Sequence, residues 1–128
     1  MQIIELNAKE LGATDIESGA ILFLEIINSA SGLADFGEKC VATKYSDGEF
    51  AGEFLISTWK SGTSHIKPIT ESEFWNQCAI KNYLETNTEI KPNNIKNILS
   101  FWDEWNNTFH VLELKTNQFY GVSWWTTV

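Results

Sequence analysis

Hydrophobic and polar residues alternate in short blocks along this chain, and the blocks predict strands at both of its ends. Residues 2–6 (QIIEL) form the first block. Residues 109–114 (FHVLEL) and 119–125 (FYGVSWW) are two further blocks, separated by the polar segment 115–118 (KTNQ). Two runs of strand-forming residues around a short polar segment are typical of a β-hairpin. We therefore expect the sequence to close with a C-terminal hairpin.

A second hairpin is predicted for residues 38–59, where strand-forming runs flank Asp47-Gly48. This dipeptide tolerates the positive φ angles of a tight hairpin turn. Strand alternation after the turn predicts one apolar face and one face that mixes acidic and aromatic residues. The second face carries Glu49, Glu53 and Trp59. Residues 60–68 (KSGTSHIKP) then read as a polar loop.

Helices are predicted between these blocks from capping signals. Thr14 and Glu17 form a capping box ahead of an apolar run, which predicts a helix over residues 15–31 ending before Gly32. Residues 21–27 (ILFLEII) fit a buried strand equally well, because a short apolar run has no diagnostic period.

Two more helices are predicted further along the chain. Thr70 and Glu73 form a second capping box, and the helix that follows should extend to about Thr86. Pro92 suits the first turn of a third helix. A regular apolar stripe follows it, with Asp103 and Glu104 outside the stripe: Ile95, Ile98, Leu99, Trp102 and Trp105.

These elements together predict one α+β domain spanning residues 1–128. Strands at both ends and in the middle, with helices between them, favour a mainly antiparallel sheet of about five strands with two or three helices. The adjacent Trp124 and Trp125 must point to opposite faces of the last strand. Either helices cover both faces of the sheet, or one of the two indoles belongs to a binding surface, and the sequence does not say which one is exposed.

The charge balance narrows the choice of partner. The chain has 17 acidic and 9 basic residues, a net charge of −8, and every basic residue is Lys. Nucleic acid is therefore a poor direct partner, because its phosphates would be repelled and no guanidinium is present to bind them. A basic protein partner would be attracted. No basic start followed by a long apolar run occurs, so we expect a soluble cytoplasmic protein without a membrane segment.

Catalytic and metal chemistry find little support in the sequence. The soft or imidazole ligands Cys40, His65, Cys78 and His110 occur singly rather than at the short spacings of zinc sites. Cys40 lies within a predicted strand and Cys78 on a predicted apolar helix face, where thiolates form with difficulty. The pair Glu71 and Glu73 is explained by a helix first turn. We expect no metal, no cofactor and no enzymatic activity.

Size, acidity, the lack of an export signal or active site, and the aromatic C-terminal hairpin FHVLELKTNQFYGVSWWTTV together resemble small cytosolic immunity proteins of bacterial polymorphic-toxin and contact-dependent growth inhibition systems. The resemblance implies a stoichiometric inhibitor that covers the active site or substrate surface of a cognate toxin C-terminal domain, commonly a basic nuclease. The partner-binding residues we predict are acidic and aromatic: Asp35, Glu38, Asp47, Glu49, Glu53, Trp59 and Trp125, with Asp103 and Glu104 as a second patch.

Two other classes of function stay open at this point. A small-ligand or carbohydrate-binding module would use Trp59, Trp124 or Trp125 as a stacking platform. A cysteine-dependent enzyme would need a reactive thiol at Cys40 or Cys78.

Overall fold

The computed structural model describes residues 1–12, 18–26, 32–45, 66–104 and 107–125. Its elements follow one another along the chain as β1 (Gln2–Asn7), α1 (Ala8–Leu11), β2 (Gly19–Ile26), α2 (Leu33–Tyr45), β3 (Lys67–Pro68), α4 (Glu71–Gln77), α5 (Lys81–Asn87), β4 (Ile95–Glu104), β5 (Asn107–Leu114) and β6 (Gln118–Trp125).

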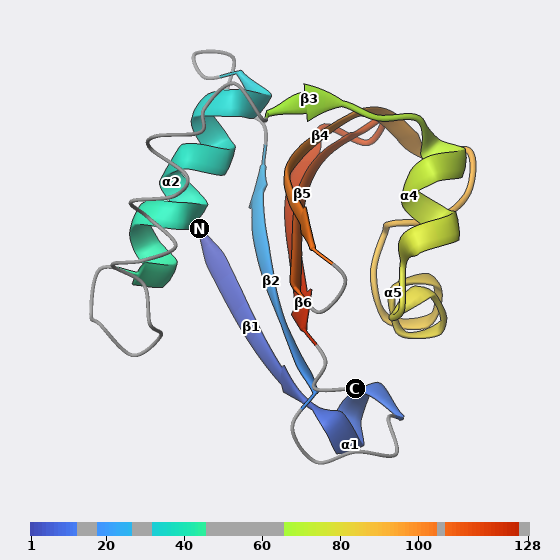
Figure 1. Cartoon of the computed structure of the whole chain (residues 1–128). Coiled ribbons are helices and arrows are strands. Elements are labelled where there is room, and N and C mark those ends of the chain that lie inside the picture. Colours follow the sequence, from blue (N-terminus) through green and yellow to red (C-terminus); the bar gives the residue numbers. More distant parts are fainter. Residues whose placement is uncertain (13–17, 27–31, 46–65, 105–106, 126–128) are drawn as a thin grey trace.

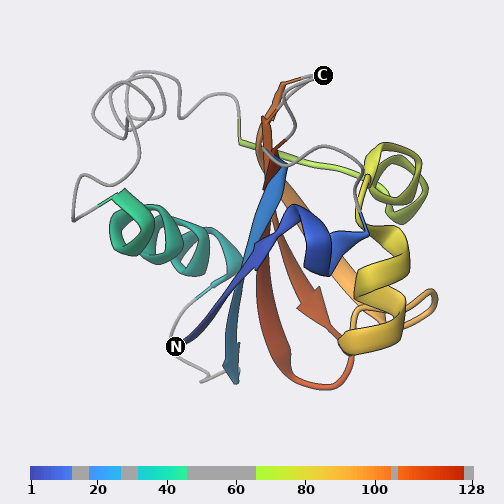
Figure 2. The ribbon, with the colours of Figure 1, turned by 90° about the horizontal axis from the view of Figure 1, so that it is seen from below.

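The described strands form one six-stranded sheet in the order β1-β2-β6-β5-β4-β3, and every pairing is antiparallel. Helix α2 lies on one face of the sheet, and α4 and α5 lie on the other (Figures 1 and 2). The predicted α+β class and antiparallel sheet are confirmed, with six strands instead of about five and with four helices in the described part.

The last strand occupies the centre of the sheet, because β6 pairs with β2 on one side and with β5 on the other. Helices therefore cover both of its faces, which accounts for its two adjacent tryptophans. Trp124 is buried on the α4 side, where its ring meets Phe74 and His110. Trp125 is half-buried and packs on the α2 side.

The core on the α4 and α5 side is built around Phe74, which is fully buried. Its ring makes edge contacts with Trp75, His110 and Trp124, at centroid distances of 5.0, 5.8 and 6.3 Å. Such edge-to-face arrangements stabilise aromatic pairs beyond the area that they bury.

The core on the α2 side depends on two glycines that allow the helix to approach the sheet. Gly37 lies in α2 directly against the ring of Phe101, where a Cβ would clash with several ring carbons. Gly121 lies in β6, and a Cβ there would come within 3.1 Å of Cys40 Sγ and of Phe23. The backbone at Gly37 and at Gly121 therefore lies directly against side chains of the facing element.

Two predicted elements in the first half of the chain are wrong. The helix predicted over 15–31 is instead strand β2, whose residues Gly19–Phe23 are all buried; residues 13–17 and 27–31 lie outside the described part. Because both faces of β2 are covered, its sequence shows no alternation. The strand predicted from residue 38 is helix α2, and the Asp47-Gly48 turn with the rest of that hairpin lies outside the described residues. Lys67 and Pro68, the last two residues of the predicted loop 60–68, form the short strand β3.

The third predicted helix is also wrong, because residues 95–104 form strand β4. The register of β4 against β5 shifts between Ile95 and Asn97 and again between Ser100 and Trp102. A β-bulge adds one residue to a strand, so two side chains on the same face become separated by three residues instead of two. The spacing of the apolar residues in β4 therefore imitates a helical period.

The remaining predictions for the second half of the chain hold, with one exception. The Thr70 capping box is present: Glu73 N donates to Thr70 Oγ1 over 3.1 Å, and Thr70 N donates to Glu73 Oε1 over 3.2 Å. The helix is interrupted, however, since α4 ends at Gln77, with Cys78 as its C-cap, and α5 begins at Lys81. The C-terminal hairpin of β5 and β6 and the first strand are confirmed. None of the described helices combines the length and the apolar composition needed to cross a lipid bilayer.

Candidate partner-binding surface

An open pocket of about 300 Å³ lies at the corner of the sheet where β1 ends, α1 begins and β6 finishes. Its lining combines two carboxylates, one amide and one indole with small and apolar groups: Glu5, Leu6, Asn7, Glu10, Ala20, Ile21 and Trp125. We refer to it as the corner pocket. Residues from both ends of the chain meet here because β2 pairs with β1 on one side and with β6 on the other.

The indole of Trp125 is positioned by the absence of a side chain on its neighbour. Gly19 of β2 is the cross-strand partner of Trp125, and a Cβ on Gly19 would lie 2.5 Å from the Trp125 ring. The ring therefore rests on the backbone of β2. This contact holds one of the bulkiest side chains of the chain at the sheet surface, half-buried and next to the corner pocket.

The polar side of the corner pocket comes from β1 and α1. Strand alternation places Ile3, Glu5 and Asn7 on the α2 side of β1, opposite to Leu6 in the core. Asn7 is also the N-cap of α1, and its side chain accepts a hydrogen bond from Glu10 N over 2.9 Å. The cap thus fixes where Glu10 leaves the first turn of α1, and places a second carboxylate beside Glu5 on the lining.

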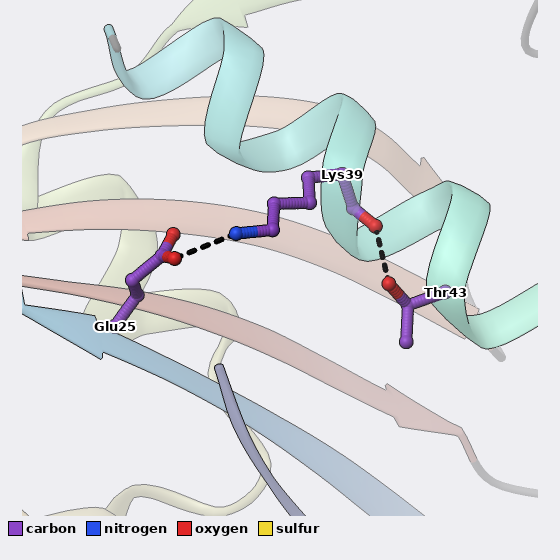
Figure 3. Close-up of polar contacts among 3 residues, drawn as sticks. All are labelled: Glu25, Lys39 and Thr43. Carbon is purple, nitrogen blue, oxygen red and sulfur yellow. Dashed lines mark hydrogen bonds and ion pairs between the residues drawn. The ribbon is translucent and has the colours of Figure 1, made fainter. Parts of the chain in front are cut away.

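Several carboxylates elsewhere in the described part of the chain form ion pairs. The carboxylate of Glu25 forms an ion pair with Lys39 Nζ over 2.6 Å (Figure 3). The backbone carbonyl of the same lysine accepts a hydrogen bond from the Thr43 hydroxyl. Glu113 lies 3.7 Å from Lys96 Nζ. Within the described ranges neither Glu5 nor Glu10 forms an ion pair. Among the described residues, the corner pocket therefore presents two carboxylates without an ion pair next to an aromatic ring.

The structure places the predicted partner-binding residues at different ends of the sheet. Trp125 lines the corner pocket. The pairing register places Glu104 level with Trp125 and two strands away, so their backbones are roughly 10 Å apart. Asp103 precedes Glu104 and is exposed. Four of the predicted residues, Asp47, Glu49, Glu53 and Trp59, lie outside the described part of the chain.

The exposed Asp35 and Glu38 belong to helix α2 and not to a strand hairpin, and they lie away from the corner pocket. Their neighbour Phe36 packs on Phe119 with ring centroids 5.3 Å apart. Phe119 is six residues before Trp125 in β6, which corresponds to roughly 20 Å along a strand. Asp35 and Glu38 therefore do not form one surface with Trp125.

Sequence reasoning missed Glu5, Asn7 and Glu10 as lining residues. The alternation in residues 2–7 contained the signal that Glu5 and Asn7 share a face. What the sequence did not contain was the long-range pairing of β2 with both β1 and β6, which brings Trp125 to them.

The other chemically capable side chains of the described residues are buried or partly buried. Burial raises the pKa of Cys40, and it raises the pKa of Cys78 to about 11, so both thiols are held protonated at neutral pH. Both are free thiols. His110 is fully buried, and burial lowers its pKa to about 4. Within the described part of the chain, neither its two ring nitrogens nor the nearby Thr108 hydroxyl has a hydrogen-bond partner. No metal-ligating cluster of His, Cys, Asp or Glu occurs among the residues that the structure describes.

Comparison of the chain with protein-family models, with curated proteins and with solved structures finds no match. The chain's own charge, fold and surface are therefore the basis for assigning it a function.

Proposed function

We propose that this protein is an immunity protein that binds a cognate toxin domain, a basic protein such as a nuclease, and neutralises it by covering its active site or substrate surface. The observation that carries the proposal is the corner pocket, in which the carboxylates of Glu5 and Glu10, without an ion pair to any described residue, border the half-buried Trp125. Aromatic anchors beside charged groups are typical of the energetically dominant parts of protein interfaces.

The charge of the chain supports the same class of partner. A net charge of −8 without any Arg repels nucleic acid and attracts a basic surface. A basic nuclease has such a surface because it binds phosphates. Lys and Arg side chains of that surface can bind carboxylates and lie over an indole ring at the same time.

The test uses variants that remove equal charge at the two ends of the sheet. Glu5→Gln combined with Glu10→Gln should weaken binding of the toxin domain at least tenfold, which corresponds to about 1.4 kcal/mol. Asp35→Asn combined with Glu38→Gln removes the same charge from α2 and serves as the matched comparison. Equal effects of the two double variants would show that only net charge matters, and would contradict the role of the corner pocket.

A small-ligand module is the second candidate, favoured by an indole that borders a pocket. Trp124 is buried and offers no platform, so Trp125 would be the stacking residue. A pocket of about 300 Å³ is at the lower end of the range for small-molecule sites. A monosaccharide that changes the tryptophan fluorescence of wild-type protein, but not of Trp125→Phe, would support this candidate.

A further inference from the structure

The two edges of the sheet are built in opposite ways. Strand β3 forms one edge, is two residues long, and consists of Lys67 and Pro68. A short strand, a lysine and a proline are three of the devices by which proteins prevent a further strand from pairing with an edge. Where β3 pairs with β4, at Leu99 and Ser100, this edge is therefore protected from strand addition.

Strand β1 forms the other edge and carries none of these three devices. It is six residues long, contains neither Lys nor Pro, and pairs with β2 in continuous register without a bulge. Among the described elements no strand pairs with its outer side. Ile3 within β1 and Met1 directly before it are 43% and 41% exposed, two of the three large hydrophobic side chains that are exposed in the described ranges.

The side chains on the α2 side of β1 are also exposed: Ile3, Glu5 and Asn7. Helix α2 packs most extensively against β4, β5 and β6. Ile3, Glu5 and Asn7 follow one another on this exposed face, and Glu5 and Asn7 line the corner pocket. A strand added beside β1 would therefore place alternate side chains next to one apolar, one acidic and one amide group.

From this arrangement we infer that an extended basic segment of the partner adds to the sheet as a seventh strand, antiparallel to β1. This inference rests on the proposed function, since the segment belongs to the toxin domain. A Lys or Arg in the segment lies opposite Glu5 and reaches the corner pocket, and an apolar residue two positions later packs on Ile3. Main-chain hydrogen bonds supply affinity and alternate side chains supply specificity, as in other cases of strand addition. A second copy of this chain is disfavoured as the occupant, because each copy carries a charge of −8 and would bring Glu5 close to Glu5 of the other.

The test measures amide hydrogen exchange in isotope-labelled wild-type protein with a peptide probe. The probe is the capped hexapeptide threonine-arginine-threonine-valine-arginine-threonine at millimolar concentration, in which valine follows the first arginine by two positions, compared with a version that has glutamate in place of both arginines. Neighbouring strands bond alternate amides. The basic probe should therefore slow exchange several-fold at every second residue of β1 and leave Lys67 of β3 unchanged, and the acidic probe should have no effect.

A pair of variants checks the edge directly. Ile3→Lys introduces a charge on the open edge and should abolish the protection, whereas Asn82→Lys adds the same charge at an exposed position of α5 and should preserve it. Absence of protection, or protection that appears without peptide as the protein concentration rises, would overturn the inference. A toxin domain that binds while the β1 amides stay unprotected would overturn strand addition alone. Strand addition by the peptide without binding of any toxin domain would instead contradict the proposed function.

Discussion

His110 makes the fold sensitive to acid. It lies in the middle of β5 with no exposed surface, flanked by Phe74 and Trp124 at centroid distances of 5.8 and 5.4 Å. Its pKa is lowered from 6.5 to about 4, and burial is the cause. The imidazole is therefore neutral in the folded protein at pH values where it already binds a proton in the unfolded chain.

The sign and size of the effect follow from this difference. Because the unfolded chain binds the proton more tightly, acidification stabilises the unfolded state. The stability contributed by neutral His110 is complete above about pH 7 and is lost as the pH falls from 6.5 towards 4. At about 1.4 kcal/mol per pKa unit, the full loss is roughly 3 kcal/mol, of which about 2 kcal/mol occurs between pH 7.5 and pH 5. Typical domains are stable by only about 5–15 kcal/mol, so a change of this size is readily measured.

The assay is urea unfolding of wild-type protein and of His110→Leu, followed by circular dichroism at about pH 7.5 and pH 5. Leucine binds no proton, so the variant should lose about 2 kcal/mol less stability than the wild type between the two pH values. Titrating carboxylates contribute to both proteins and cancel in the comparison. Equal losses in the two proteins, or an imidazole pKa near 6.5 measured by NMR in the folded state, would refute the reasoning.

Two further predictions concern the packing and capping of the helices. Gly37→Ala places a methyl group against the ring of Phe101 and should lower the free energy of unfolding by about 1–3 kcal/mol, despite the better helix propensity of Ala. Gly32→Ala is the control, because open space surrounds Gly32 and the free energy of unfolding should change little. Equal effects of the two variants in thermal unfolding would contradict the close packing of α2. Thr70→Ala removes the oxygen that accepts the hydrogen bond from Glu73 N, and should lower the free energy of unfolding measured with urea by about 1 kcal/mol. Ser72→Ala in the same helix is the control. A Thr70→Ala protein as stable as the wild type would show that the capping box contributes nothing.

The sequence predicted the elements whose signals are local. The Thr70 capping box and the C-terminal hairpin depend on a few neighbouring residues, and both are present. Helix α2 had a usable local signal as well, since Leu33, Phe36, Cys40 and Val41 recur at helical spacing and pack on the sheet. The strand-forming residues beside Asp47-Gly48 outweighed it in the sequence-based interpretation.

The errors arose where tertiary structure decides the pattern. Strand β2 is covered on both faces, so its apolar run has no alternation to distinguish it from a helix. In β4, bulges place Ile95 and Ile98 on one face and Leu99 and Trp102 on the other, each pair three residues apart, as in a helix. Both effects come from the partner strands and helices, which no local window contains.

The corner pocket was predictable only in part. Trp125 was expected at the partner-binding surface because two adjacent tryptophans on a strand cannot enter one core. Its neighbours Glu5 and Glu10 are more than a hundred residues away in sequence and reach it only through the pairing of β2 with both β1 and β6.

The most direct test of the immunity role is a binding titration by calorimetry against the C-terminal domain of a large secreted protein encoded immediately upstream, at low and at high salt. We predict tight one-to-one binding that weakens as the salt concentration rises, with loss of the toxin's activity at equimolar ratio. No binding at low salt, or binding that leaves the toxin fully active, would contradict the proposal that this acidic protein neutralises a basic toxin.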